Sequence, residues 1–326
     1  MILPDPATPL PPDAAAAAFA AILDGKIDDA ALARFLTALA DRGETVAEVV
    51  AAAQALRSRQ LAPLHAADAI DVCGTGGDGR HSVNVSTAVA LVVAACGVKV
   101  AKHGNRAASS QSGAADVLAE LGVPELPVDR LGACLDTVGI TFLHAARHHP
   151  AMARVAPVRR RLGRRTIFNL LGPLANPAGV ERQLVGVFAP HWTVPLAQAL
   201  AALGARRAMV VHGDGYDELA VSGDSRFALA SAGGVTTGGI VPSDAGVGCH
   251  AADALAGGDA AHNAARLRAL LAGEAGAYHD IVVLNAAAAL TIADASLGLL
   301  PAANRARAAL ASGAANDILA RWSAFR

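Results

Sequence analysis

The stretch Asp71-Val-Cys-Gly-Thr-Gly-Gly-Asp-Gly79 decides how the rest of this chain is interpreted. It follows an apolar run and precedes Asn84-Val-Ser-Thr87, which opens an alanine- and valine-rich helical pattern. Glycines lack a Cβ atom, so such a loop can turn sharply and bring backbone N–H groups against an anion. The N-terminus of the following helix adds further donors and a favourable dipole. The order strand, glycine loop, helix therefore predicts a phosphate-binding site.

The spacing of the glycines excludes the commonest nucleotide-binding loops. Neither G-x-x-x-x-G-K-[ST] nor G-x-G-x-x-G is present, which disfavours nucleoside triphosphates and dinucleotides as ligands. Asp78 is unusual inside a phosphate loop; it could orient the backbone, accept sugar hydroxyls, or be bridged to an anion by Mg²⁺. A tight turn without a ligand is the alternative for the loop, and simple helix capping is the alternative for Asn84, Ser86 and Thr87.

Two later segments strengthen the phosphate hypothesis. Lys102-His-Gly-Asn-Arg106 is expected to be a second loop at the same edge, with the Lys102 cation available to phosphate. Asp217 and Glu218 follow a strand and a glycine-rich turn, and hard carboxylate oxygens suit Mg²⁺. The alternatives are a structural salt bridge for Lys102, a satisfied loop histidine for His103, and solvated carboxylates for the acidic pair. No nucleophile–base pair stands out, which favours a reaction based on positioning and charge stabilisation.

The pattern around these motifs predicts an α/β fold. Short apolar runs alternate with amphipathic helical segments, which indicates a mostly parallel central sheet flanked by helices. Ligands of such sheets bind beyond the carboxyl ends of the strands, where both motif loops are expected. The predicted strands are Ala69–Cys73, Val98–Ala101, Ile140–Leu143, Leu184–Phe188 and Ala208–His212.

The first 65 residues have a different pattern and are expected to form a small α-helical domain, with residues 66–326 as the large α/β domain. Apolar positions recur at helical spacing in the N-terminal part. A helical segment near 165–180, broken by Gly172-Pro173, is expected to join the small domain or act as a hinge. Helices are predicted at Ala14–Leu23, Ala30–Leu39 and Val46–Leu56, and again at Ala260–Leu271, Ile281–Ile292 and Ala302–Leu310.

Composition limits the function classes. The 326 residues carry a net charge of −1, which disfavours bulk nucleic-acid binding, and 53% are hydrophobic, as in a globular chain. No signal peptide or membrane span is expected, so a cytoplasmic protein is predicted. The four scattered cysteines form no C-x-x-C pair and indicate neither zinc nor disulfides. One segment is locally basic and is either a solvated helix face or presents at least one arginine to an anion: Arg154, Arg159, Arg160, Arg161, Arg164 and Arg165.

Taken together, the motifs resemble those of the anthranilate phosphoribosyltransferases, of the nucleoside phosphorylase and class IV phosphoribosyltransferase fold family. They occur in the family's order and cover roughly residues 70 to 290. The segments that carry the resemblance are Gly74-Thr-Gly-Gly-Asp-Gly79, Asn84-Val-Ser-Thr87, Lys102-His-Gly-Asn-Arg106, His149-Pro-Ala-Met152, Pro157-Val-Arg159, Arg165-Thr-Ile-Phe-Asn-Leu-Leu-Gly-Pro-Leu174 and Asp217-Glu-Leu219.

The resemblance implies a Mg²⁺-dependent enzyme of tryptophan biosynthesis. The amine of anthranilate attacks C1 of 5-phosphoribosyl 1-pyrophosphate, and pyrophosphate leaves. It also implies a homodimer joined through the helical domains. The residues implied to bind the phosphoribosyl substrate are Gly74, Gly77, Asp78, Ser82, Asn84, Val85, Ser86, Thr87, Lys102, His103, Gly104, Asn105, Arg106, Ala107, Ala108, Ser109, Ser110 and Ala114. Those implied for anthranilate are Gly74, His103, Asn105, His149 and Arg159, with Arg159 pairing the carboxylate, and those for Mg²⁺ are Ser86, Asp217 and Glu218.

The chain departs from the family pattern at several positions. Ala114 stands where a serine is common, which removes one phosphate-binding hydroxyl. His144 and Ala146 replace the usual Phe and Pro, which predicts a differently shaped aromatic tunnel. Arg161 replaces a common acidic residue, and residues 224–250 match poorly.

Two other functions are compatible with a fold of this kind. A pyrimidine nucleoside phosphorylase would use phosphate and a nucleoside, but the Lys102–Arg106 loop argues against it. A non-catalytic nucleic-acid-binding relative would need an extended basic groove, and the overall charge argues against that.

Overall fold

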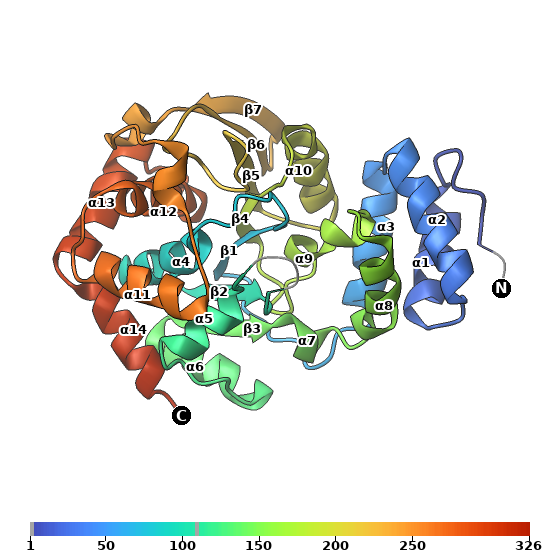
Figure 1. Cartoon of the computed structure of the whole chain (residues 1–326), viewed down its shortest axis with the longest axis horizontal. Coiled ribbons are helices and arrows are strands. Elements are labelled where there is room, and N and C mark those ends of the chain that lie inside the picture. Colours follow the sequence, from blue (N-terminus) through green and yellow to red (C-terminus); the bar gives the residue numbers. More distant parts are fainter. Residues whose placement is uncertain (1–2, 108–110) are drawn as a thin grey trace.

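The computed structural model describes residues 3–107 and 111–326, which form a helical bundle beside an α/β layer structure (Figure 1). The bundle contains α1 (Pro12–Leu23), α2 (Asp29–Arg42), α3 (Val46–Arg57) and, from far along the chain, α8 (Met152–Leu162). Local signals set its boundaries: Asp28 caps α2, and Thr45 and Glu48 form a capping box on α3. The three predicted N-terminal helices are therefore confirmed.

A seven-stranded sheet runs through the larger part in the order β3-β2-β1-β4-β5-β6-β7. The first five strands are parallel, and β6 and β7 add to one edge in antiparallel fashion. The bounds are β1 (Ile70–Gly74), β2 (Val100–Gly104), β3 (Ile140–His144), β4 (Arg182–Gly186), β5 (Arg207–Gly213), β6 (Ser225–Ser231) and β7 (Gly234–Ile240). The expectation of a mostly parallel sheet is confirmed, but β6 and β7 were not predicted.

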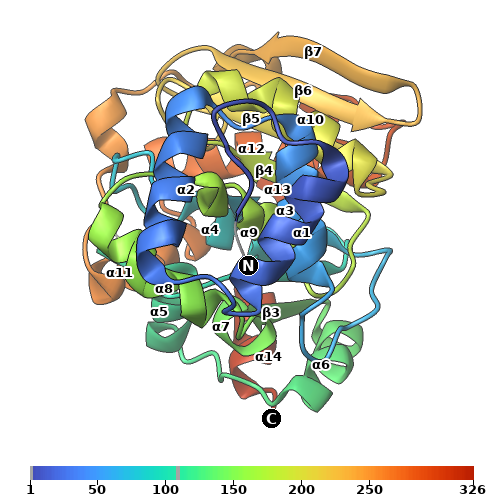
Figure 2. The same cartoon turned by 90° about the vertical axis from the view of Figure 1, so that its right-hand side faces the viewer.

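Helices cover both faces of the sheet (Figures 1 and 2). One face packs on a core that includes α4 (Val85–Ala95) and α12 (Ala277–Ala293), and the other on a core with α10 (Thr193–Ala202) and the bundle. Consecutive residues of a strand point to opposite faces of the sheet and so enter different cores, as Leu184 and Val185 of β4 do. The remaining α-helices are α5 (Ala114–Glu120), α6 (Leu131–Val138), α7 (Ala145–His148), α9 (Leu171–Leu174), α11 (Ala260–Leu271), α13 (Leu299–Ala311) and α14 (Ala314–Ala324).

The bundle is not packed as an isolated unit. Its apolar residues belong to one continuous core with α9, α10 and the nearer face of β4 and β5. Arg57 of α3 strengthens this joint, because its guanidinium donates to the carbonyls of Leu174 (2.6 Å) and Leu203 (3.2 Å). The segment near 165–180 lies at this junction as a short 3-10 turn (Ile167–Asn169) followed by α9.

One strand is longer than the sequence indicated. We expected Val98–Ala101 to end before a loop beginning at Lys102, and this was wrong. β2 continues to Gly104 and pairs with β3 over its full length. Lys102 and His103 are therefore buried strand residues, and the loop begins at Asn105.

No helix within residues 3–107 and 111–326 combines the length and the apolar character needed to cross a membrane.

Candidate active site

The glycine loop leaves the carboxyl end of β1 in a conformation that requires glycine. Gly76, Gly77 and Gly79 all have positive φ (65°, 76° and 78°), where a side chain would be strained. The N–H of Gly76 donates to Oδ2 of Asp217 (2.8 Å). The first predicted motif and the acidic pair, separated by about 140 residues, therefore meet directly.

Two glycines at neighbouring strand ends make this meeting possible. Gly74 of β1 and Gly186 of β4 are direct partners in the sheet register. A Cβ atom at Gly186 would lie 1.4 Å from the carbonyl oxygen of Asp217, and one at Gly74 would lie 2.3 Å from its Oδ2. Gly186 was not among the predicted site residues, and only the register shows its role.

The acidic pair is held in an environment that resists ionisation. Removal from water and, to a smaller extent, the nearby carboxylate of Asp78 raise the pKa of Asp217 to about 7. Burial also raises the pKa of Glu218 well above its ordinary value, and Asp217 adds to that effect, whereas Lys102 opposes it. The solvated alternative for this pair is therefore wrong, at least for Glu218, which is 8% exposed.

Asp78 orients backbone in this structure, as one of its expected roles required. Its Oδ1 accepts from the N–H of Arg80 (3.0 Å), and its Oδ2 from the N–H of Asp217 (3.5 Å). The carboxylates of Asp78 and Asp217 thus lie beside each other. Two neighbouring carboxylates with one raised pKa form a site that favours a cation.

Lys102 lies beneath the loops rather than within them. Its side chain is 2% exposed, and Nζ donates to the carbonyl of Val72 (2.7 Å) and to Oγ of Ser86 (3.1 Å). Its charge also faces the carboxylates of Asp71 and Glu218. Lys102 therefore balances buried negative charge and fixes the Ser86 hydroxyl.

The first turn of α4 is not capped by the residues that could have capped it. Asn84 makes no side-chain cap; its Oδ1 instead accepts from Nδ2 of Asn263 (2.8 Å) and Oγ of Ser112 (3.3 Å). The Thr87 hydroxyl is buried and has no hydrogen-bond partner in the described part of the chain. The pure capping alternative is therefore wrong for Asn84 and Thr87, and the dipole at a helix N-terminus is suited to an anion.

The other predicted phosphate residues surround this helix start. Val85 is buried in the core at the first position of α4, and Ser82 forms an isolated bridge with Ala256. Ala114 opens α5, where its Cβ faces Gly104. The Ala107 N–H donates to Asp116 (2.9 Å). The predictions for Ala108, Ser109 and Ser110 lie outside the described residues.

A pair of neutral histidines lies behind the loops. The ring centroids of His103 and His149 are 5.4 Å apart, in an edge-to-face arrangement. Nδ1 of His103 bonds the carbonyl of Gly172 (3.0 Å), and Nε2 of His149 bonds the carbonyl of Ala175 (2.8 Å). Burial lowers the pKa of His103 to about 3 and that of His149 to about 4. Since carbonyls only accept, those two nitrogens carry the protons, and the other two are buried acceptors without partners among the described residues.

One arginine of the basic segment differs from its neighbours. Arg161 pairs with Asp29 (2.6 Å) and Arg164 with Asp41 (2.7 Å), so these two tie α8 and its end to the bundle. Arg159 is half-buried, lies 6.0 Å from the ring centroid of Phe168, and has no acidic partner within the described residues. Burial lowers its pKa. Arg159 is thus the member suited to an external carboxylate.

Asn105 and Arg106 lie where the second loop leaves β2. Oδ1 of Asn105 accepts from the Arg106 N–H (2.9 Å) and contacts Nε2 of His144 (3.1 Å). The Arg106 guanidinium bonds Asp116 (3.2 Å) and lies 3.9 Å from Glu125. His144, a departure from the family pattern, therefore touches a predicted site residue.

The residues present fit a Mg²⁺ ion that is shared with a substrate. No group of three or more His, Cys, Asp or Glu side chains within the described residues could hold a metal by itself. Mg²⁺ commonly uses one or two carboxylates together with substrate phosphates and water. Asp217 and Glu218 supply such carboxylates next to the glycine loop.

Comparisons with known proteins agree with this architecture and site. Residues 7–59 match a model described as "Glycosyl transferase family, helical bundle domain", and residues 66–316 match "Glycosyl transferase family, a/b domain". The chain is therefore a member of this two-part class of glycosyl transferases.

The relatives define the family more closely. The anthranilate phosphoribosyltransferase of Novosphingobium aromaticivorans is 53% identical over 99% of this chain and 98% of its own length. The crystal structure of the Thermus thermophilus enzyme is 44% identical, with a TM-score of 0.92 over 98% of this chain and 96% of that one. The Saccharomyces cerevisiae enzyme in complex with PRPP and Mg is 26% identical, with a TM-score of 0.86 over 96% and 92%.

This chain belongs to the anthranilate phosphoribosyltransferase family. Enzymes of this family are Mg²⁺-dependent and act in tryptophan biosynthesis. They transfer the phosphoribosyl group of 5-phosphoribosyl 1-pyrophosphate to the amine of anthranilate and release pyrophosphate.

Proposed function

We propose that this chain carries out that transfer at the carboxyl edge of its sheet, where the glycine loop meets the acidic pair. The observation that carries the proposal is the hydrogen bond from Gly76 to Asp217, which joins the predicted phosphate cradle to the predicted metal carboxylates. Because Gly74 and Gly186 lack Cβ atoms, Asp217 can lie this close to the ends of β1 and β4, which a simple turn would not require.

The phosphoribosyl substrate is proposed to lie across the glycine loop and the start of α4. The positive end of the α4 dipole, which Asn84 does not cap, suits its phosphates. Thr87 contributes a buried hydroxyl without a partner in the described chain, and Ser86 contributes a hydroxyl fixed by Lys102. Asp217, Glu218 and Ser86 would hold Mg²⁺, which neutralises charge on the departing pyrophosphate.

Anthranilate is proposed to bind between Arg159 and Asn105. Arg159 pairs the carboxylate, because it is the half-buried cation of its segment without an acidic partner among the described residues. His103 and His149 offer a neutral, edge-to-face aromatic wall, which suits the ring of this substrate. Gly74 separates the two substrates and leaves room for the amine to approach C1.

The residues of this chain then act by positioning rather than by proton transfer before attack. An aromatic amine is uncharged near neutral pH and needs no strong base. The two buried histidines stay neutral, so they exclude water and orient the ring. Approximation of the two substrates in a fixed geometry accounts for a large share of such a rate enhancement.

The assignment of Arg159 has a matched control on the same helix. We expect Arg159→Ala to raise the KM for anthranilate ~10- to 100-fold, because a charge-assisted contact is lost, while the KM for the phosphoribosyl donor stays within about twofold. Exposed Arg160→Ala should leave both constants unchanged. The assay follows the loss of anthranilate fluorescence with the donor and Mg²⁺. No loss at saturating substrates would overturn the function, and an equal effect of Arg160→Ala would overturn the assignment.

We also propose a division into residues 1–65 and 66–326, a cytoplasmic enzyme, and a homodimer joined through the bundle. The family resemblance supports the dimer, and the different patterns of the two parts support the division. Light scattering of the purified chain would test the dimer; a monomeric mass across the working concentration range would contradict it.

A further inference from the structure

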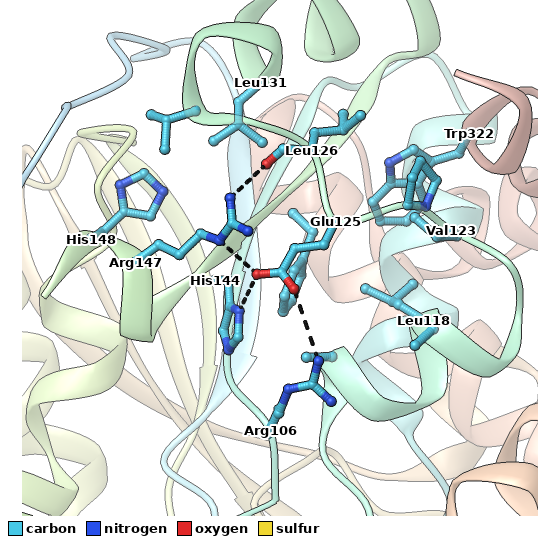
Figure 3. A pocket seen from close by; sticks show the side chains of 15 residues that line it. Arg106, Leu118, Val123, Glu125, Leu126, Leu131, His144, Arg147, His148 and Trp322 are labelled. Carbon is cyan, nitrogen blue, oxygen red and sulfur yellow. Dashed lines mark hydrogen bonds and ion pairs between the residues drawn. The ribbon is translucent and has the colours of Figure 1, made fainter. Parts of the chain in front are cut away.

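A chain of hydrogen bonds connects Asn105 to a pocket. Figure 3 shows the part of the chain around Glu125, His144, Arg147 and Arg106. The pocket has a volume of about 140 Å³, and its apolar lining residues include Leu118, Leu131 and Trp322. Glu125 also lines it and lies among the side chains of Arg106, His144 and Arg147. His144 of β3 connects this cluster to the site, because its Nδ1 bonds Glu125 (2.8 Å) and its Nε2 bonds Asn105 (3.1 Å).

The direction of each hydrogen bond follows from chemistry. The N–H of Arg106 can only donate, so the Asn105 atom that it contacts is the oxygen. The same oxygen contacts Nε2 of His144, which must therefore donate as well. Glu125 accepts from Nδ1 on the other side of the ring. His144 thus donates from both nitrogens, which only the protonated imidazole can do.

This arrangement leaves only the side-chain NH₂ group of Asn105 available to a ligand. Its oxygen is occupied by two donors, and its backbone carbonyl accepts from the N–H of Ala115 (3.2 Å). The side-chain NH₂ group is directed away from these partners, and Asn105 is exposed. Asn105 can therefore offer only N–H donors, which is the group that a substrate carboxylate accepts.

We infer that His144, held by Glu125, is a positioning residue that fixes the amide of Asn105 as a donor to the carboxylated acceptor substrate. The inference rests on the proposed function and adds a residue to it. The charges that face His144 are those of Glu125 on the segment after α5, Arg147 and His148 on α7, and Arg106 with its partner Asp116. Bonding to His144, together with Arg147, keeps the pKa of Glu125 below its usual range, so the carboxylate is ionised near neutral pH.

The test separates a positioning role from a structural one. His144→Phe keeps a ring of similar size but removes both N–H donors. We expect a rise of ~10-fold in the KM for anthranilate, with kcat and the KM for the phosphoribosyl donor within about twofold of wild type. Glu125→Gln keeps the histidine in place, so it remains informative if His144→Phe folds poorly, and it should give a smaller rise in the same constant.

Arg147→Gln is the matched control, because Arg147 Nε also bonds Glu125 (2.7 Å) but does not touch Asn105. We expect it to change the KM for anthranilate less than twofold. If Arg147→Gln reproduces the full effect of His144→Phe, or if His144→Phe leaves the KM for anthranilate unchanged in an active enzyme, the inference is overturned. An inactive wild type would instead overturn the proposed function.

Discussion

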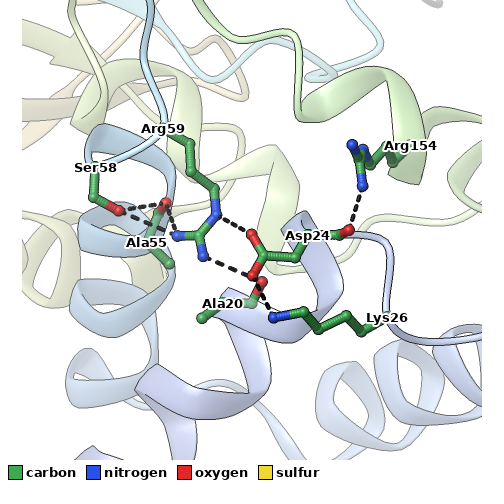
Figure 4. A network of polar contacts seen from close by, with 7 residues as sticks. All are labelled: Ala20, Asp24, Lys26, Ala55, Ser58, Arg59 and Arg154. Carbon is green, nitrogen blue, oxygen red and sulfur yellow. Dashed lines mark hydrogen bonds and ion pairs between the residues drawn. The ribbon is translucent and has the colours of Figure 1, made fainter. Parts of the chain in front are cut away.

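Asp24 in the helical bundle and Asp217 at the edge of the sheet are held in opposite ways. In the bundle, Asp24 bonds Arg59 (2.7 Å) and Lys26 (3.0 Å), while its carbonyl accepts from Arg154 (Figure 4). These bonds lower the pKa of Asp24 to about 2. At the sheet edge, burial and Asp78 raise the pKa of Asp217 to about 7. A carboxylate that accepts several hydrogen bonds from the protein stabilises the fold, whereas a buried carboxylate with few hydrogen-bond donors around it is available to a ligand.

The strongest test of this comparison removes the sheet-edge charges. We expect Asp217→Asn with Glu218→Gln to lower kcat by ~100-fold or more, because the charge that develops on pyrophosphate loses its Mg²⁺ support. The double variant should also lose the wild-type dependence of rate on Mg²⁺. A rate and a Mg²⁺ profile like those of the wild type would exclude both residues from the metal site.

Removal of a carboxylate that accepts several hydrogen bonds in the bundle should lower the stability of the fold and leave activity intact. Glu48 is fully buried and accepts from Arg42 (2.5 Å), the N–H of Leu10 (2.9 Å), and both the N–H and the hydroxyl of Thr45 (2.8 and 2.9 Å). Glu48→Ala leaves these donors without a partner and should cost about 3 kcal/mol of unfolding free energy. Urea unfolding measures this, with exposed Glu274→Ala as a control that changes it by less than about 0.5 kcal/mol. Equal effects of the two variants would refute the role of the network.

We expect the binding of Mg²⁺ to release protons from the edge of the sheet but not from the bundle. Burial holds the pKa of Asp217 at about 7, so the free enzyme carries part of a proton there near neutral pH. Binding of Mg²⁺ requires the ionised carboxylate, so we expect a fraction of a proton to be released per metal. Calorimetry in buffers of different ionisation enthalpy measures this number. Asp217→Asn should abolish the release, and Lys26→Ala in the bundle should not change it.

The sequence was most informative where a function depends on consecutive residues. Gly76, Gly77 and Gly79 predicted a sharply turning loop, which the structure builds with positive φ at all three, and the spacing of the glycines disfavoured other nucleotide loops. The predicted strands and most helices also followed from local periodicity. β6 and β7 did not, since Gly234–Ile240 contains three glycines and is mostly exposed, so its apolar alternation is weak.

Features that depend on distant segments could not be predicted. The need for glycine at position 186 appears only when β4 is placed beside β1 and the Asp217 backbone crosses their ends. Lys102 was expected in a loop, yet it lies beneath the site among the buried carboxyl groups of Asp71 and Glu218. The link from Glu125 through His144 to Asn105 joins three separate segments, and no spacing in the sequence reveals it.

We expect the smallest effect from the replacement of Arg59, and the pH dependence of the Tm tests its cause. The pKa of Asp24 in the folded chain is about 2, below its ordinary value of 3.8, mainly because of its bond with Arg59. A lowered pKa means that this interaction stabilises the fold above pH 3.8 and that the stabilisation is lost as the pH falls towards 2.

Arg59→Ala should therefore lower the Tm by a few degrees at neutral pH, with kcat and both KM values unchanged. The difference from wild type should shrink as the pH falls through about 2, because Asp24 of the wild type then becomes protonated as well. Lys26 is 63% exposed, so Lys26→Ala should change the Tm less. A Tm difference between wild type and Arg59→Ala that is independent of pH would mean that Arg59 acts through its bonds to the carbonyls of Ala55 and Ala20 rather than through Asp24.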